Sequence, residues 1–311
     1  MSIDCECDKG PRWRVRQPIA FEGVRVGIRE RLHPLLRSFG AKPTYLLSPE
    51  LLRDAASVEV LSSLAGCELG THLHGEFASP DAEVPRITDD VQRDYPSDVE
   101  RAKLTLLTRA FHDAFGKAPA SFRAGRFGIG PSSVSILEGL GYRVDSSVTP
   151  HVDWRAVSPG LSFVGAPEQP YHPDTANAAR AGDARLLEVP VTVRKPRLAF
   201  LPFVGRRLER RWLRPTKVEG PELVSIAREA VDAATRAQQS APVVLNAMFH
   251  NVEVVAGASP YAATDGQARR ILDRLAYLLD FARREGVVGI GLADVPEVLG
   301  DQAVSAFAST S

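Results

Sequence analysis

Two histidines, His72 and His74, stand two residues apart at the end of an apolar run. Successive side chains of an extended strand point to opposite faces, so these imidazoles face the same side, about 6.6 Å apart along the strand. Imidazole is the commonest metal ligand in proteins, and zinc binds it readily. The spacing therefore predicts a metal site, with a hydrogen-bonded structural role for the histidines as the alternative.

Acidic residues with the same spacing begin the chain, where Asp4, Glu6 and Asp8 alternate with Cys5 and Cys7. In a strand the three carboxylates share one face and the cysteines take the other. Neighbouring carboxylates repel one another, and a bound cation or a nearby arginine offsets that cost. The alternation favours a site of carboxylates and histidines over one of two cysteines and two histidines, and a solvated acidic strand end is the plain alternative.

Two later apolar runs also end in residues that can do chemistry. Arg123 lies in Phe-Arg-Ala-Gly, and beside a carboxylate cluster its fixed charge would hold an aspartate ionised. His250 ends the run 243–249, and an unperturbed pKa near 6.5 suits imidazole to protonate a leaving group at neutral pH. Together the four segments predict an acid–base site beside the metal.

Short apolar runs alternate with amphipathic stretches along the chain. The expected strands cover residues 2–7, 43–47, 67–72, 121–124, 142–146, 186–193, 243–249 and 288–292, and the expected helices cover 24–39, 49–64, 97–116, 132–140, 221–238 and 265–285. This alternation predicts parallel strands with helical crossovers, as a β/α barrel or a doubly wound sheet. The candidate residues fall at the carboxyl ends of strands, where barrel enzymes place their chemistry.

Composition limits the class of protein. With 311 residues, 44% of them hydrophobic and 24% charged, we expect one large domain over 1–300 and a flexible tail over 301–311. Lysine plus arginine equal aspartate plus glutamate at 38 each, which gives no case for a nucleic-acid partner. Three cysteines and no apolar leader predict a cytoplasmic protein, and because Asp4 follows only three residues, we expect part of the first strand to be missing upstream.

Five motifs, in order from residue 3 to about 298, resemble the polysaccharide deacetylase family, also called the NodB-homology family or carbohydrate esterase family four. They are Asp-x-Glu, His-x-His after Glu-Leu-Gly, Phe-Arg-Ala-Gly-x-x-Gly, Gly-Tyr-x-x-Asp-Ser-Ser, and a late Phe-His followed by Ser-Pro-Tyr. The resemblance implies an α/β fold, a distorted, incomplete β/α barrel of about seven strands. It also implies a divalent metal, most commonly Zn²⁺, with Co²⁺ or Ni²⁺ as alternatives.

The resemblance also implies roles for particular residues. Carried over by motif, Asp4 is the catalytic base, Arg123 orients it, His250 is the catalytic acid and Asp145 supports that acid. The metal ligands are Glu6, His72 and His74. The family usually spaces its histidines by four residues, so Glu76 is the alternative to His74, and Asp153 with Trp154 resembles a second acidic motif placed late.

The implied activity is hydrolysis of an N-acetyl or O-acetyl group on a saccharide. For an N-acetyl group, the bond that breaks is a carbon–nitrogen bond other than a peptide bond. A sugar deformylase with the same site is the nearest alternative. A non-catalytic barrel that binds glycans is an alternative from another class of protein. The metal ligands distinguish the enzymatic hypotheses from the non-catalytic one, because hydrolysis by this mechanism requires a bound metal.

The segment 194–217 is an insertion outside the family pattern. It holds nine basic residues against one acid, Glu209, with large apolar residues interleaved. Such a mixture suits an anionic glycan, a lipid-phosphate headgroup or the inner surface of a membrane. We therefore expect an acylated saccharide that is anionic or lipid-linked, unless these arginines pair with acids elsewhere in the chain.

Overall fold

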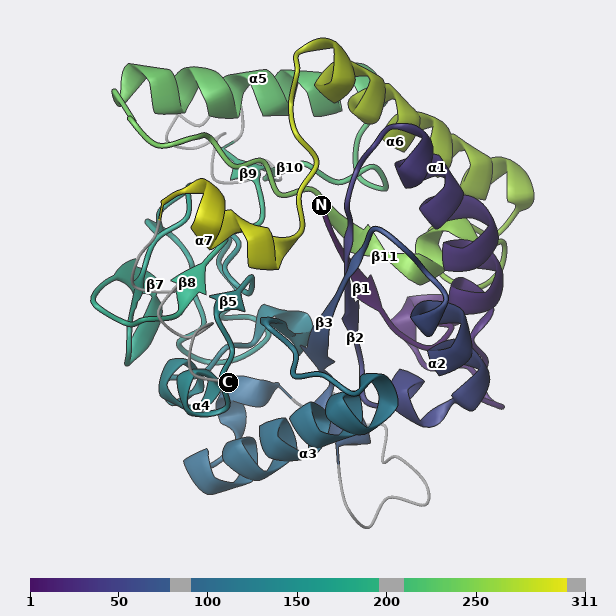
Figure 1. Cartoon of the computed structure of the whole chain (residues 1–311), viewed down its shortest axis with the longest axis horizontal. Coiled ribbons are helices and arrows are strands. Elements are labelled where there is room, and N and C mark those ends of the chain that lie inside the picture. The colour runs from purple at the N-terminus through teal and green to yellow at the C-terminus, as the bar shows by residue number, and fades with distance from the viewer. Residues whose placement is uncertain (79–90, 196–209, 301–311) are drawn as a thin grey trace.

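The computed structural model describes residues 1–78, 91–195 and 210–300 and is built around a central sheet (Figure 1). Seven parallel strands follow the order β11-β1-β2-β3-β4-β5-β8. Their bounds are β1 Ser2–Cys5, β2 Thr44–Leu47, β3 Glu68–Leu73, β4 Ser121–Ala124, β5 Val144–Asp145, β8 Leu187–Glu188 and β11 Met248–His250. The first strand, β1, thus lies in the sheet beside β11, which comes late in the sequence.

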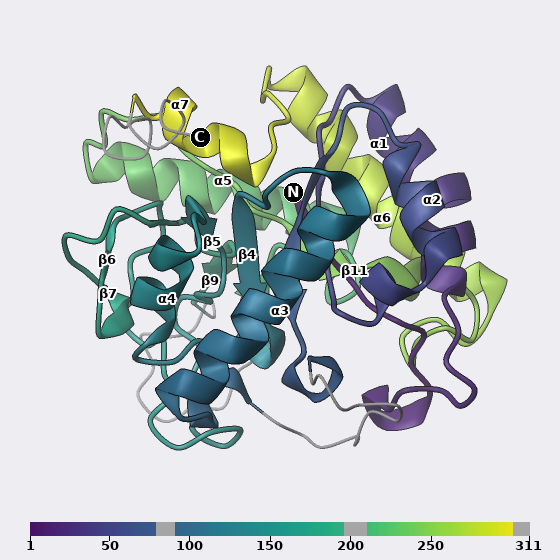
Figure 2. The same ribbon diagram turned by 60° about the horizontal axis from the view of Figure 1, so that its bottom comes forward.

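Helices surround the sheet, with α1, α2 and α6 together on one side and α3 lying across another (Figures 1 and 2). The α-helices are α1 His33–Ser38, α2 Ala55–Ser62, α3 Ser97–Phe115, α4 Ser133–Gly139, α5 Gly220–Arg236, α6 Asp265–Arg284 and α7 Val295–Val298. A π-helical segment, η2 Gly23–Leu32, leads directly into α1. Apolar side chains of this segment, of α6 and of β1 and β2 form one continuous buried cluster. The core therefore holds the strand that carries Asp4.

The sheet curves into a half-barrel that does not close. Its edge strands, β8 and β11, are not paired with each other. The chain segments beside them do touch: the Thr192 amide donates to the Asn246 carbonyl at 3.0 Å, and the Asn246 amide donates to Thr192 Oγ1 at 2.8 Å. This is the incomplete barrel of about seven strands that the family resemblance implies.

One expected strand is wrong. Residues 288–292 form no strand, although Leu292 N–H donates to Thr44 Oγ1 at 2.8 Å. The segment crosses the amino ends of β2 and β3 instead of lying beside a strand, and Gly291 packs there so closely that a Cβ atom would lie 2.6 Å from Glu68 Oε2. Glycine suits this close crossing because it has no side chain.

Other expected elements are shorter than predicted. The expected helix 49–64 contains a short 3-10 turn, η3 Leu51–Arg53, and then α2, because Asp54 accepts a hydrogen bond from the Ser57 amide and caps a new helix there. Two small antiparallel pairs lie outside the main sheet: β6 Pro173–Asp174 with β7 Asn177–Ala181, and β9 Val193–Arg194 with β10 Arg211–Trp212.

Two further expectations fall partly or wholly outside the described residues. The flexible tail 301–311 lies outside them, and so does the part of the insertion from 196 to 209. In the described part of the chain, no helix is both long and apolar enough to cross a lipid bilayer.

Candidate metal centre

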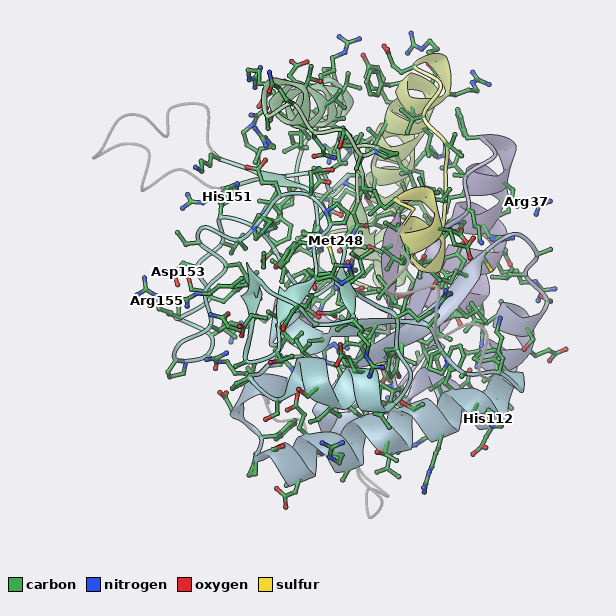
Figure 3. The ribbon with its side chains drawn as sticks, turned by 60° about the vertical axis from the view of Figure 1, so that its left-hand side comes forward. Arg37, His112, His151, Asp153, Arg155 and Met248 are labelled. Carbon is green, nitrogen blue, oxygen red and sulfur yellow. The ribbon has the colours of Figure 1, made fainter. Side chains whose placement is uncertain are left out.

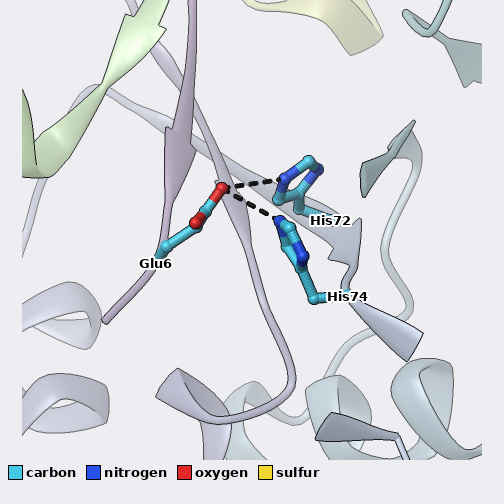
Figure 4. Close-up of side chains that lie close together, drawn as sticks. All are labelled: Glu6, His72 and His74. Carbon is cyan, nitrogen blue, oxygen red and sulfur yellow. Dashed lines mark hydrogen bonds and ion pairs between the residues drawn. The ribbon is translucent and has the colours of Figure 1, made fainter. Parts of the chain in front are cut away.

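Glu6, His72 and His74 converge on one point at the carboxyl ends of β1 and β3 (Figure 4). Oε1 of Glu6 lies 3.3 Å from Nε2 of His72 and 3.0 Å from Nε2 of His74. One donor atom from each of the three buried side chains lies within 4.8 Å of the others. Two imidazole nitrogens and a carboxylate oxygen match the three protein ligands of a catalytic zinc site.

The other nitrogen of each imidazole has a partner that fixes the ring. Nδ1 of His72 donates to the carbonyl oxygen of Arg123 at 3.0 Å, and Nδ1 of His74 lies 3.3 Å from Oε1 of Glu76. Metal-binding histidines commonly use such a carbonyl or carboxylate to set the ring orientation. Both Nε2 atoms are therefore directed at the same point, and Glu76 lies behind His74 instead of replacing it.

Opposite charges compensate one another inside the cluster. Burial alone would lower the pKa of His74, but Glu6 and Glu76 outweigh it and raise that pKa to about 9. Burial alone would raise the pKa of Glu6, yet Lys9, whose Nζ lies 2.8 Å from Oε2, and His74 hold it well below its usual range. Glu6 therefore stays ionised and keeps Oε1 directed at the histidines.

Asp4 lies beside this cluster and is held by Arg123. Nη1 of Arg123 donates to Oδ1 of Asp4 at 2.6 Å, while Oδ2 faces Nε2 of His72 at 3.9 Å. Burial would raise the pKa of Asp4, but Arg123, His72 and His250 outweigh it and lower that pKa. The structure thus presents one free carboxylate oxygen of an ionised Asp4 next to the candidate metal position.

His250 closes the other side of the site. Its Nε2 lies 3.8 Å from Oδ2 of Asp4 and 3.6 Å from Oε1 of Glu6, and its Nδ1 donates to Oε1 of Glu253 at 2.7 Å. Glu253 is fully buried and is also bonded by Arg214 and Thr216. Burial would raise the pKa of Glu253, but Arg214 and His250 outweigh it, so the carboxylate that supports His250 is ionised.

Asp145 does not hold the position that the sequence suggested for it. In the register of the sheet Asp145 is the neighbour of Phe122 and Glu188, and Phe122 faces opposite to Arg123 because side chains alternate along β4. Oδ1 of Asp145 instead accepts from Ser147 Oγ at 2.6 Å. In the described part of the chain, the carboxylate that contacts His250 is therefore that of Glu253, three residues after His250, and not that of Asp145.

Asp8 also lies away from the site, contrary to the expected alternation. The strand ends at Cys5, and the buried carboxylate of Asp8 accepts hydrogen bonds from the amides of Glu22 and Gly23 at 3.1 and 2.9 Å. Asp8 therefore organises the start of the π-helical segment. Cys5 and Cys7 are buried among apolar side chains and lie outside the cluster of ligands.

Asp153 lies at the surface. Its carboxylate is paired with Arg155, and both side chains lie at the outer edge of the molecule, in contrast to Met248 at its centre (Figure 3). In the insertion, Arg194 pairs with Glu168 and Arg211 with Glu222 and Glu229. Arg214 likewise pairs with Glu253, so these three arginines follow the alternative in which they pair with acids elsewhere, whereas Arg210 donates to the His151 carbonyl at 2.9 Å. Residues 196–209 of the insertion are outside the described residues.

A pocket of about 270 Å³ opens over the cluster. Beside Asp4, Glu6, His72, His74 and His250, it is lined mainly by aromatic and basic side chains: Trp13, Phe127, Trp154, Tyr261, Arg126 and Arg214. Trp13 packs edge-on to His250 with ring centroids 4.7 Å apart. The volume is slightly below the range of about 300–1,000 Å³ of common ligand sites, which suits a small group or a single ring.

No family model and no curated protein matches this chain. Solved structures do: a protein from Mycobacterium smegmatis assigned to the polysaccharide deacetylases shares 18% identity over 90% of this chain and 79% of its own, with a TM-score of 0.53. A protein from Parabacteroides distasonis assigned as a glycoside hydrolase/deacetylase matches at 11% identity over 97% of this chain and 71% of its own, with a TM-score of 0.61. The PuuE allantoinase matches at 16% identity, 90% and 74% coverage and a TM-score of 0.55.

These likenesses define the class of fold. The chain is an α/β protein with the seven-stranded parallel half-barrel of the polysaccharide deacetylase type. At such low identities the comparison extends to the fold alone. What the site does must be argued from its own residues.

Proposed function

We propose that this protein is a metal-dependent hydrolase that removes an acetyl group from a saccharide, acting on a carbon–nitrogen bond other than a peptide bond when the group is N-linked. The observation that carries the proposal is the convergence of Glu6, His72 and His74, flanked by Asp4 on one side and His250 on the other. The fold shared with polysaccharide deacetylases supports it.

Glu6, His72 and His74 would hold the metal. Their donor set suits Zn²⁺, and Co²⁺ or Ni²⁺ accept the same nitrogen and oxygen ligands. When bound, a divalent ion supplies polarisation of the acyl carbonyl and lowers the pKa of water.

Asp4 and His250 would move the protons. Asp4 is ionised and presents Oδ2 to the site, so it can accept a proton from the attacking water. His250, held through Nδ1 by Glu253, presents Nε2 and can donate a proton to the leaving amine or alcohol. One water is consumed, the acyl–nitrogen or acyl–oxygen bond breaks, and the acid and the free sugar group leave.

The test compares the purified wild-type protein with His72→Ala and Glu6→Ala. Because three protein ligands hold a single ion in a catalytic zinc site, we expect about one divalent ion per chain in the wild type by mass spectrometry, and loss of that ion in both variants. Hydrolysis of acylated sugars should then require the metal. Acetate among the products supports the deacetylase, and formate would identify a deformylase. A protein that binds no metal and hydrolyses no acylated sugar would be a non-catalytic barrel.

A further inference from the structure

Two turns of the same unusual kind reach the pocket from different strands. After β1, the turn η1 Pro11–Trp13 holds Arg12 and Trp13 at φ of 58° and 63°, and after β4, the turn η6 Gly125–Phe127 holds Arg126 and Phe127 at φ of 53° and 55°. Residues with side chains rarely adopt this left-handed conformation, and where it persists it is often found at ligand clamps. Each turn thus presents an arginine followed by an aromatic ring.

Both aromatic rings line the pocket over the metal ligands. Trp13 and Phe127 are joined there by Trp154 and Tyr261, and Phe127 stacks on Trp154 with ring centroids 5.6 Å apart. Flat apolar walls with a few polar groups fit a small ring-shaped ligand. The lining therefore matches a sugar ring that brings its acyl group to the metal ligands.

The charges around the site cancel in pairs. Four basic side chains each meet one carboxylate, in the pairs Lys9–Glu6, Arg123–Asp4, Arg126–Glu76 and Arg214–Glu253. This set is neutral with its carboxylates ionised, so a bound divalent ion would leave it with two positive charges. An excess of positive charge in a partly enclosed pocket attracts an anion.

The first turn also carries an arginine on each side of Trp13. Arg12 and Arg14 are exposed, and among the described residues neither guanidinium has a hydrogen-bond or ion-pair partner. With Arg16 they line a hollow of about 430 Å³ on the same loop that sends Trp13 into the pocket. Guanidinium groups bind phosphate oxygens through paired, charge-assisted hydrogen bonds.

We propose that the substrate is an acylated sugar that carries a phosphate or diphosphate, an inference that rests on the proposed function. The sugar ring occupies the pocket that Trp13 and Phe127 line, and the phosphate lies at the rim on Arg12 and Arg14. A phosphate group suits this rim better than a single carboxylate, because it offers several oxygens to the neighbouring guanidinium groups.

Binding of a phosphorylated sugar tests this inference without any need for turnover. Calorimetry on the metal-loaded protein compares N-acetylglucosamine 1-phosphate with N-acetylglucosamine. We expect tighter binding of the phosphorylated sugar, and the double variant Arg12→Gln/Arg14→Gln should weaken that binding about tenfold while leaving the neutral sugar unchanged. The matched control is Arg269→Gln/Arg270→Gln, two exposed arginines of α6, which should change neither affinity.

Equal affinities for the two sugars, or a double variant that binds both as the wild type does, would overturn the inference. If neutral acyl sugars are hydrolysed without any preference for phosphate, the inference fails and the proposed function stands. If the phosphate preference is found but no acyl sugar is hydrolysed, the proposed function fails and the phosphate site stands.

A second comparison separates soluble from membrane-bound sources of the phosphate. It compares the affinity for a nucleoside diphosphate sugar in solution with the affinity for the same sugar linked through a diphosphate to a polyprenyl chain in phosphatidylcholine vesicles. Tighter binding of either supports the inference and identifies the source. Binding of neither above the neutral sugar contradicts it.

Discussion

Arg123 and Asp4 form an ion pair across the inside of the half-barrel, with Nη1 of Arg123 2.6 Å from Oδ1 of Asp4, although β2 and β3 separate their strands in the sheet. The guanidinium is completely buried and also donates to the Ser146 carbonyl and to the hydroxyls of Ser2 and Ser146. The proposed base is therefore positioned from the far side of the barrel.

Replacing Arg123 by Met should destabilise the protein strongly. The change leaves Asp4 as a buried charge without its partner, which typically costs about 3–5 kcal/mol. Urea denaturation gives the free energy of unfolding, and Asp4→Asn/Arg123→Met should recover part of the loss. Arg283→Met, which removes an exposed ion pair with Asp280, is the control and should change little. A loss in the double variant equal to the sum of the losses in Asp4→Asn and Arg123→Met would show that Asp4 and Arg123 are not coupled.

Replacing Glu253 by Gln should lower kcat more than it raises KM. The carboxylate fixes the His250 ring through Nδ1, and general acid–base catalysis contributes about 10²–10⁴-fold to rates, so we expect a decrease in kcat of roughly 10–100-fold. Steady-state kinetics and metal content are measured together, with Glu219→Gln at the surface as the control. A variant that loses its metal, or whose KM alone changes, would argue against this positioning role.

Replacing Glu76 by Gln should weaken metal binding without abolishing it. The carboxylate lies behind His74 and is held by Arg126, and loss of such a partner typically reduces metal affinity about 10–100-fold. Competition with a chelator measures the affinity. Glu59→Gln, an exposed carboxylate of α2, serves as the control. If Glu76→Gln abolished metal binding as completely as His72→Ala, Glu76 would be a ligand in its own right.

Replacing Glu188 by Gln should change how stability depends on pH. Burial and the neighbouring charge of Asp145 raise the pKa of Glu188 well above its usual range. The folded state then binds a proton more tightly than the unfolded state, so this contribution to stability is complete below the unfolded pKa of about 4.3 and is lost as pH rises through the folded pKa. Relative to Glu188→Gln, the wild-type Tm should fall from about pH 4.5 upward. Parallel Tm curves for the two proteins would contradict this.

The alternation of side chains along strands pairs Asp4 with Glu6 and His72 with His74, whereas the roles of these residues were expected from the family resemblance. Asp4 and Glu6, and likewise His72 and His74, keep the spacing of two even where the regular strand has ended, at Cys5 and at Leu73. The parallel order of the strands then brings the two pairs together at one edge. These features are local to short segments, which is why the sequence alone suffices for them.

The supporting residues could not be predicted in the same way. Glu253 reaches His250 from the 3-10 turn η7 Asn251–Val254, and Lys9 reaches Glu6 beyond the end of β1. Both are three residues from their partners, a spacing that signals contact only once a turn is known to be present. The position of Asp145 is hard to predict for a related reason, because its face depends on the register between β4 and β5.

The placement of β1 beside β11 has a consequence for biosynthesis. Asp4 and His250 are direct neighbours in the sheet, although most of the chain separates them in sequence. The proposed metal ligands all lie within the first 74 residues, whereas the proposed proton donor is synthesised much later. A nascent chain on the ribosome therefore carries the complete set of ligands well before it carries His250, and contacts over such long sequence separations form slowly. Metal capture can precede catalytic competence during synthesis.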